Sequence, residues 1–237
     1  MNDSLLIVLQ LPETDSKSLD EEINEMILLA KTLNYNVCDT IIQKKTKIDT
    51  STYIGKGKLE SIINICNEMK IKTMFINDEL KPSHFKKIQS LCGKSIKLID
   101  RTWLILDIFQ NHAKTKEAKT QVELAKVQYM MPRLVGMWTH LERQEGGTGI
   151  RGGPGEKQIE IDRRLLRKNV DRLKKDLLKI DVQRRTQRKS RTNIFKVAIA
   201  GYTNAGKSSL LRALTGYEAL IKDQLFATLD TTSKKVT

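Results

Sequence analysis

Short apolar runs and helix-length amphipathic stretches alternate through the first half of the chain. The apolar runs have the β-branched and aromatic character of strands, and polar residues or glycines separate them from the stretches with helical spacing. Strands that alternate with helices are typical of an α/β domain with a mainly parallel sheet, which we expect over residues 1–113. The expected strands are residues 4–11, 37–43, 73–77 and 96–99, and the expected helices are residues 18–33, 59–69, 83–91 and a helix that begins at 102–109.

Two local signals mark the starts of helices in this domain. Ser18 and Glu21 have the spacing of a capping box, which predicts that the first helix opens at Ser18. The segment from Gly55 to Lys58 reads Gly-Lys-Gly-Lys and predicts a turn into the second helix. A glycine turn at a helix N-terminus can also hold an anion. We favour the simple turn and leave the anion site as an alternative.

The hydrophobic spacing changes after residue 113 to the alternating threes and fours of packed helices. Two such stretches of similar length predict an antiparallel helical hairpin over residues 114–192, and Pro132 predicts a kink or break in its first helix. The first stretch comprises Leu124, Val127, Met131, Leu134, Trp138 and Leu141, and the second comprises Leu166, Val170, Leu173, Leu177 and Ile180.

The connection between these two helices, residues 145–156, contains six glycines in twelve residues. A hairpin needs only a few such residues to turn. We therefore expect this loop to approach a partner closely, with a plain flexible tip as the alternative.

Charge is concentrated in the second helix of the hairpin. The 237 residues carry 42 Lys or Arg and 28 Asp or Glu, a net charge of +14. Between Arg163 and Lys196 there are 14 basic residues and three aspartates, so this segment holds most of the excess. Such a segment favours a polyanion such as RNA, because each neutralised phosphate releases counterions. A solvated helix face is the alternative.

Composition also narrows the class of protein. The longest apolar runs are far shorter than the ~18–20 residues of a membrane span, so we expect no transmembrane helix. The N-terminus has no basic start and no small-residue cleavage site, which argues against a secretory signal. Cys38, Cys66 and Cys92 are far apart and form no Cys-x-x-Cys pair. We expect single thiols in a reducing cytoplasm rather than disulfides or a zinc site.

The strongest chemical signal lies near the end of the sequence. An apolar run at residues 194–200 predicts a buried strand, and a helix is expected at residues 209–215. Between them is the phosphate-binding pattern G-x-x-x-x-G-K-S. The glycines let the backbone wrap a phosphate, the lysine reaches the outer phosphates and the serine hydroxyl ligates Mg²⁺. The residues of this loop are Gly201, Tyr202, Thr203, Asn204, Ala205, Gly206, Lys207 and Ser208.

Together with several longer motifs, this loop resembles the HflX family of translational GTPases. The resemblance extends from about residue 51 to the last residue. Its most specific part is the glycine-loop hairpin directly before the phosphate loop, followed by a Phe-Ala-Thr-Leu-Asp motif. The segments that carry it are residues 53–60, 120–129, 132–134, 137–143, 155–156 with Glu160 and 162–164, the loop 201–208, and residues 223–230.

The resemblance implies an N-terminal α/β domain, a helical hairpin whose loop reaches into the ribosome, and the start of a P-loop GTPase domain at residues 193–237. It implies binding of the large (50S) ribosomal subunit and its rRNA, with GTP binding and hydrolysis coupled to ribosome splitting or rescue. We further expect a cytoplasmic monomer without a membrane span, with peripheral attachment to the membrane as the other possible location.

The resemblance also assigns the cofactors, GTP and Mg²⁺, to residues of this sequence. The loop Gly201 to Ser208 would hold the GTP phosphates, and Asn204 is placed to help position a monovalent cation. Ser208 and Thr228 would be the Mg²⁺ ligands, Thr228 being the switch I threonine, whose hydroxyl suits the metal while its amide meets the γ-phosphate. The switch I segment would comprise Phe226, Ala227, Thr228, Leu229 and Asp230.

The largest departure of the sequence from the family pattern is the absence of two GTPase motifs. The sequence contains neither the Asp-x-x-Gly that positions Mg²⁺ and the attacking water nor the Asn-Lys-x-Asp that reads guanine. No catalytic residue is therefore assigned, and guanine specificity follows from the resemblance alone. Finding both motifs in a continued reading frame would favour the GTPase, and an authentic stop after Thr237 would favour a non-catalytic module that keeps only the basic hairpin for RNA. A P-loop ATPase or kinase is a third hypothesis.

Overall fold

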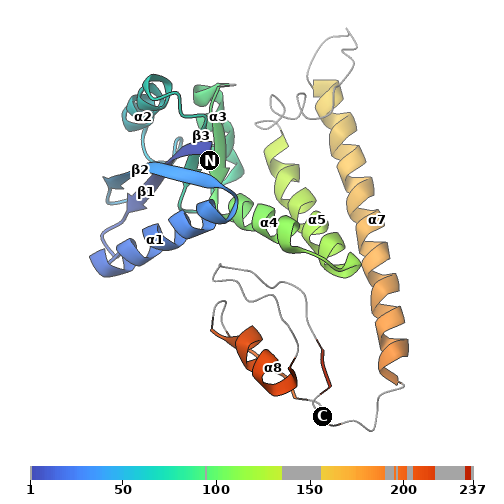
Figure 1. Ribbon diagram of the computed structural model, residues 1–237. Helices are drawn as coiled ribbons and strands as arrows, with labels where there is room; N and C mark the ends of the chain where they lie inside the picture. The colour runs from blue at the N-terminus through green and yellow to red at the C-terminus, as the bar shows by residue number, and fades with distance from the viewer. Residues whose placement is uncertain are drawn as a thin grey trace.

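The computed structural model describes residues 2–93, 95–134, 156–189, 195, 197–201, 205–216 and 233–235. The first of these ranges and the start of the second form an α/β domain around one parallel sheet, whose strands lie in the order β2-β1-β3-β4 (Figure 1). The expected mainly parallel sheet is confirmed. The elements are β1 Asn2–Gln10, α1 Ser16–Thr32, β2 Tyr35–Lys44, α2 Lys56–Glu68, β3 Thr73–Ile76, α3 Pro82–Cys92, β4 Lys97–Asp100 and α4 Arg101–His112.

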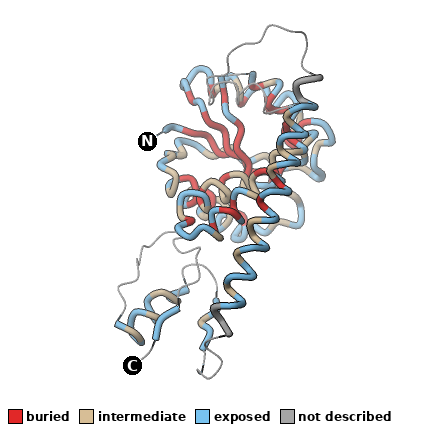
Figure 2. Tube along the Cα trace, turned by 90° about the vertical axis from the view of Figure 1, so that its right-hand side faces the viewer, coloured by how far each residue is buried: buried red, intermediate tan, exposed pale blue. Residues whose placement is uncertain are grey.

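Helices cover both faces of the sheet, and alternate residues of β1 explain why. Leu5 and Ile7 belong to the apolar cluster that packs under α2 and α3, whereas Leu6 and Val8 belong to the cluster that packs under α1 and α4. Side chains on a strand point to opposite faces in turn. The uninterrupted apolar run at residues 5–9 is therefore buried on both sides, and Figure 2 shows the strands as the most deeply buried part of the chain.

The capping box predicted at Ser18 is wrong. Helix α1 begins two residues earlier, with Asp15 as its N-cap residue and no side-chain capping bond. A turn closed by the Thr14 N–H on the Leu11 carbonyl brings the chain to Asp15 in an extended conformation, and the amide of Leu19 then bonds back to the Asp15 carbonyl. Ser18 therefore lies inside the first turn, where the box cannot form.

The glycine turn before α2 serves the core of the domain. Gly55 has φ +90°, a conformation that favours glycine, and the helix starts at the next residue, Lys56. Just before it, Tyr53 and Ile54 are buried in the apolar cluster, and the Tyr53 hydroxyl donates to Asp78. This packing favours the interpretation as a structural turn.

Two helices form the expected antiparallel hairpin. Helix α5, Lys116–Met130, ends in the single 3-10 turn η1, Met131–Arg133, and helix α7 comprises Glu156–Lys189. The break at Pro132 is confirmed. Arg184 of α7 pairs with Glu117 at the start of α5, and Arg172 pairs with Glu123 further along, so the two helices run in opposite directions.

The chain near the phosphate loop departs from one expectation. Residues 197–200 have no strand assignment, so the strand expected at 194–200 is not formed in the described part of this segment. Phe195 is 92% exposed and Val197 is 78% exposed. An apolar strand needs neighbouring strands for its hydrogen bonds and its burial, and among the described residues no strand pairs with this segment. Helix α8, Lys207–Thr215, follows as expected but begins two residues earlier.

Candidate nucleotide loop and nucleic-acid interface

The described part of the phosphate loop turns directly into helix α8. Gly206 has φ +79°, in the left-handed region, and lies immediately before the first helical residue, Lys207. The amide of Leu210 is the first to bond back to the Gly206 carbonyl, at 2.9 Å. The amides before Leu210 therefore lie at the positive end of the helix dipole, where an anion is stabilised.

The first glycine of the pattern lies close to the lysine. A Cβ at Gly201 would lie 3.8 Å from Cδ of Lys207 and 3.9 Å from Cβ of Ala205. The stem of Lys207 therefore lies next to Gly201, and Lys207 and Ser208 are half-buried. The structure brings together Gly201, Ala205, Gly206, Lys207 and Ser208, whereas Tyr202, Thr203, Asn204 and all of Phe226, Ala227, Thr228, Leu229 and Asp230 lie outside the described residues.

Apolar side chains between α5 and α7, which we call the seam, hold the hairpin together, as the hydrophobic spacing of the sequence predicts. Val127 of α5 packs with Val170 and Leu173 of α7 in one apolar cluster, and Leu124, Met131 and Leu166 pack against it. Leu177 and Ile180 are half-buried and Leu134 is buried outside this cluster, while Trp138 and Leu141 lie outside the described residues.

Helix α7 is much longer than the partner on which it packs. Its 34 residues extend about 51 Å at 1.5 Å per residue. In Figure 1 the helix runs along α5 and continues past it, and in Figure 2 most of its length is exposed. The seam covers only one side, which leaves the rest of the surface available for a partner.

The exposed side of α7 carries basic side chains that form no ion pair with any described residue. We call these six residues the basic stripe. Four other basic residues of α7 are paired: Arg172 with Glu123, Arg184 with Glu117, Lys179 with Asp176 and Arg185 with Asp181. The basic stripe consists of Arg163, Arg164, Arg167, Lys168, Lys174 and Lys175.

A buried polar cluster joins the α/β domain to the hairpin. Asp100 is fully buried at the end of β4, where it caps α4 by accepting from the Trp103 amide at 2.9 Å and also accepts from the Leu80 amide at 3.0 Å. The Tyr129 hydroxyl of α5 donates to the same carboxylate. Burial raises the pKa of Asp100, and the bonds from Tyr129 and the two amides oppose that rise.

Arg133 completes this cluster, which we call the joint: Asp100, Tyr129 and Arg133. The guanidinium donates to the Leu80 carbonyl at 2.5 Å and to the Tyr129 carbonyl at 2.9 Å, and it lies 3.6 Å from the centre of the Tyr129 ring. Its outer partner is Glu79, at 3.3 Å. The sequence analysis did not identify the joint. The available signal was Tyr129 and Arg133 four residues apart, just where the helix ends at proline.

Three protein families match this chain in sequence order. Residues 20–110 match the family described as GTP-binding GTPase N-terminal, residues 112–191 match GTP-binding GTPase Middle Region, and residues 196–237 match 50S ribosome-binding GTPase. Curated relatives named GTPase HflX match across nearly the whole chain, from Alkalihalophilus pseudofirmus (44% identical over 225 residues, 94% of this chain) and Flavobacterium psychrophilum (46% over 220 residues, 93% of this chain). The chain belongs to the HflX family.

This chain spans about half the length of the curated relatives that it matches: 52% of the two proteins above and 50% of the Escherichia coli relative, which is 38% identical over 218 residues. Among solved structures, a GTP-binding protein from the archaeon Sulfolobus solfataricus in complex with GDP is 28% identical. It aligns with a TM-score of 0.54 over 91% of this chain and 54% of that chain. A structure described as an SsGBP and GDP complex aligns with a TM-score of 0.58, also at 28% identity, over 94% of this chain and 60% of that chain.

The described residues contain neither a membrane-spanning helix nor a cluster of metal-ligating side chains. None of their helices has the length and apolar character needed to cross a membrane. No group of three or more His, Cys, Asp or Glu side chains in these residues is arranged to hold a metal ion. The three cysteines are free thiols, with Cys66 and Cys92 buried and Cys38 exposed.

Proposed function

We propose that the protein is a GTPase that binds GTP and Mg²⁺ at the loop 201–208 and binds the large ribosomal subunit through the hairpin of α5 and α7. The coupling of GTP binding and hydrolysis to ribosome splitting or rescue is part of this proposal. The observation that carries it is the unpaired basic stripe on an exposed helix that precedes a phosphate loop, in a chain of the HflX family. The family described as 50S ribosome-binding GTPase, which matches the last 42 residues, supports the same partner.

The nucleotide part of the proposal rests on the start of α8. Gly206 turns the backbone so that amides at the positive end of the helix face the position of a phosphate, and Lys207 adds a cation next to them. The hydroxyl of Ser208, the second helical residue, is a hard oxygen donor of the kind that Mg²⁺ prefers, so it fits the role of a metal ligand. When bound, Mg²⁺ would neutralise phosphate charge, and Thr228 would supply the second ligand.

Replacing Lys207 with Ala tests this site, because it removes the cation at the β- and γ-phosphates. In this chain extended to a complete GTPase domain, we expect GTP to bind in preference to ATP. The Lys207→Ala variant should lose GTP binding, measured by titration calorimetry. Lys168→Ala, which removes the same charge from the exposed surface of α7, is the control and should leave the affinity unchanged. Unchanged GTP affinity in Lys207→Ala would refute the site.

The ribosomal part of the proposal rests on the basic stripe. A carboxylate partner would neutralise these side chains within the protein, whereas the six have none among the described residues. Unpaired cations along an exposed helix favour binding to the phosphates of RNA. Contacts to phosphate position a protein on RNA but do not read its sequence, so the glycine-rich loop 145–156 is proposed to fix the place of binding.

Co-sedimentation of the 237-residue chain with large ribosomal subunits tests this interface. We expect binding at low salt that weakens steeply as salt rises, and its loss when Arg163, Arg164, Arg167 and Lys168 are replaced together by Glu. A control with the same change in charge replaces four exposed lysines of the α/β domain and should still bind. These lysines are Lys17, Lys31, Lys72 and Lys87. Survival of binding in the first variant would show that the stripe is only a solvated surface.

A non-catalytic RNA-binding module remains a second candidate, favoured by the exposed segment before the phosphate loop. In that case the chain would bind the ribosome in the same way but would bind no nucleotide. The division into domains at residues 1–113, 114–192 and 193–237, the monomeric state and the cytoplasmic location also stay predictions.

A further inference from the structure

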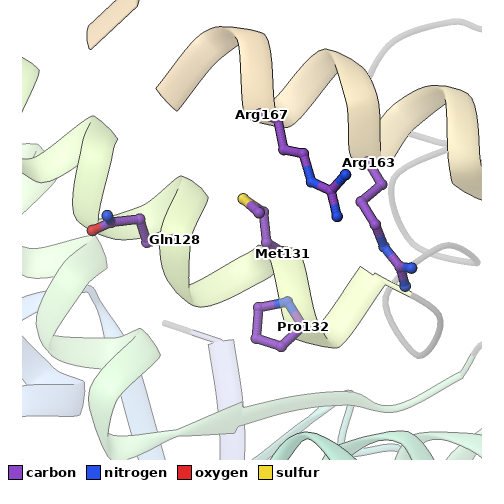
Figure 3. A pocket seen from close by; sticks show the side chains of 5 residues that line it. All are labelled: Gln128, Met131, Pro132, Arg163 and Arg167. Carbon is purple, nitrogen blue, oxygen red and sulfur yellow. The ribbon is translucent and has the colours of Figure 1, made fainter. Parts of the chain in front are cut away.

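A pocket lies between the end of α5 and the start of α7, on the side of the hairpin that carries the basic stripe (Figure 3). Its volume is about 360 Å³, at the small end of the roughly 300–1,000 Å³ typical of ligand pockets. Met131 and Pro132 form an apolar floor, and Arg163 and Arg167 stand over them from α7. The stem of Gln128 borders one end, with its amide directed away from the arginines (Figure 3).

The spacing and the lack of ion-pair partners of the two arginines favour the binding of an anion between them. They are one helical turn apart, and like charges at that spacing repel by a few tenths of a kcal/mol. None of the five lining residues is acidic, and neither guanidinium forms an ion pair with any described residue. An anion between the two side chains would turn the repulsion into two charge-assisted hydrogen bonds.

An anion alone does not account for the apolar floor. Met131 and Pro132 offer a polarisable, apolar surface directly below the guanidinium groups, and a ligand that uses the whole pocket needs a flat apolar part joined to a negative part. A nucleotide has this composition. RNA-binding proteins commonly bind unstacked bases against flat side-chain surfaces, including the planes of arginine guanidinium groups.

We propose that this pocket binds one unpaired nucleotide of an RNA, with its base against Met131 and Pro132 and its phosphate between Arg163 and Arg167. The inference deepens the proposed ribosomal RNA binding and rests on it. The rest of the basic stripe favours RNA over an acidic peptide, because Arg164, Lys168, Lys174 and Lys175 continue the unpaired positive charge along α7 to meet the phosphates of the neighbouring nucleotides.

A single-stranded RNA ten nucleotides long, with one 2-aminopurine near its centre, tests the proposal with the full chain. The fluorescence of 2-aminopurine rises when the base leaves the stack of its neighbours. We expect a rise when the chain binds the single strand and none with the same strand in a duplex. The Arg163→Gln/Arg167→Gln variant should lose the rise at saturation and should lower the salt slope of binding by about 0.7, because the pocket neutralises one phosphate.

The matched control is Arg164→Gln/Lys168→Gln, which removes two charges at the same spacing on the same turns of α7 but does not line the pocket. It should weaken binding through charge alone and keep the fluorescence rise at saturation. A second pocket variant, Met131→Gln, keeps the charge and the approximate size while replacing the apolar floor with an amide. We expect it to reduce the rise with little change in the salt slope, and circular dichroism checks that its helices are intact.

The outcomes separate the pocket from the interface. Loss of the rise in both pocket variants, with its retention in the control, supports the pocket. Binding in which the rise is absent, or is equally affected in the pocket variants and the control, overturns the pocket and leaves RNA binding by the hairpin intact. A chain that binds neither the RNA oligonucleotide nor the large subunit at low salt refutes both the proposed function and this inference.

Discussion

Replacing Arg133 with Met should weaken the interaction between the hairpin and the α/β domain and lower the free energy of unfolding. The side chain of Arg133 is 5% exposed, and its guanidinium supplies hydrogen bonds to the carbonyls of Leu80 and Tyr129 from one position between the two domains. Methionine fills a similar volume but has no donor. Both buried carbonyl bonds are therefore lost, while the apolar packing is largely kept.

The expected loss in the free energy of unfolding follows from the buried groups that the substitution leaves without a hydrogen-bond partner. Each carbonyl deprived of its donor costs about 1–3 kcal/mol when buried. The positive charge that opposes the rise in the pKa of Asp100 is also removed, and that carboxyl group is fully buried. The two carbonyls together account for about 2–6 kcal/mol, whereas the exposed bond to Glu79 contributes little. We expect the free energy of unfolding to fall by about 2–6 kcal/mol at pH 7.

Urea denaturation of the full chain measures this change. The fluorescence of Trp103 is a local probe, because its ring lies 5.7 Å from that of Tyr129; a Trp138→Phe background removes the other tryptophan. Arg172→Met is the control, since it removes an arginine that is 62% exposed and pairs with Glu123 on the surface, and it should cost no more than about 1 kcal/mol. A loss in Arg133→Met no larger than in this control would refute the reasoning.

Three further predictions follow from the seam, the joint and the exposed segment. Leu173→Ala should lower the free energy of unfolding by about 2–4 kcal/mol in urea denaturation, because Leu173 is only 2% exposed between α5 and α7. Leu178→Ala, at 66% exposure on the same helix, should change it by less than about 0.5 kcal/mol. Equal effects of the two substitutions would contradict the packing of α5 on α7. Burial raises the pKa of Asp100 above 3.8, so the folded state favours the protonated carboxyl and its contribution to stability is lost as the pH rises through the folded pKa. The stability of the natural chain relative to Asp100→Asn should therefore fall between about pH 4 and the folded pKa, and an increase over this range would contradict it. Finally, the 237-residue chain alone should show little GTP-dependent rise in melting temperature, because the segment before its phosphate loop is exposed; a large cooperative rise would show that the loop is already organised.

The features that the sequence predicted correctly are those that depend on local periodicity. Uninterrupted apolar runs such as that of β1 predict strands buried on both faces, and the threes and fours from Leu124 to Met131 predict the side of α5 that meets α7. Pro132 predicts the end of α5 because its ring removes a donor and clashes with the preceding turn.

The features that the sequence did not predict depend on partners distant in the chain. The joint brings Asp100 at a strand end together with Tyr129 and Arg133 at the end of α5, and it bonds to the Leu80 backbone before α3. No local pattern in the sequence connects these positions. The expected strand at 194–200 failed for the same reason, since apolar residues become a strand only beside other strands. In the phosphate loop, the pattern identified the residues, and the structure adds the turn at Gly206 and the position of the Lys207 stem near Gly201.

The most direct test of the account is the preference of this chain between the two ribosomal subunits. Equal amounts of purified large and small subunits, both rich in RNA phosphate, are mixed with the 237-residue chain near physiological salt and separated on a sucrose gradient. A surface that only attracts polyanions would distribute between them according to phosphate content. We expect the chain to sediment predominantly with the large subunit, and the variant in which Arg163, Arg164, Arg167 and Lys168 are replaced by Glu to sediment with neither. Equal distribution of the natural chain between the two subunits would contradict it.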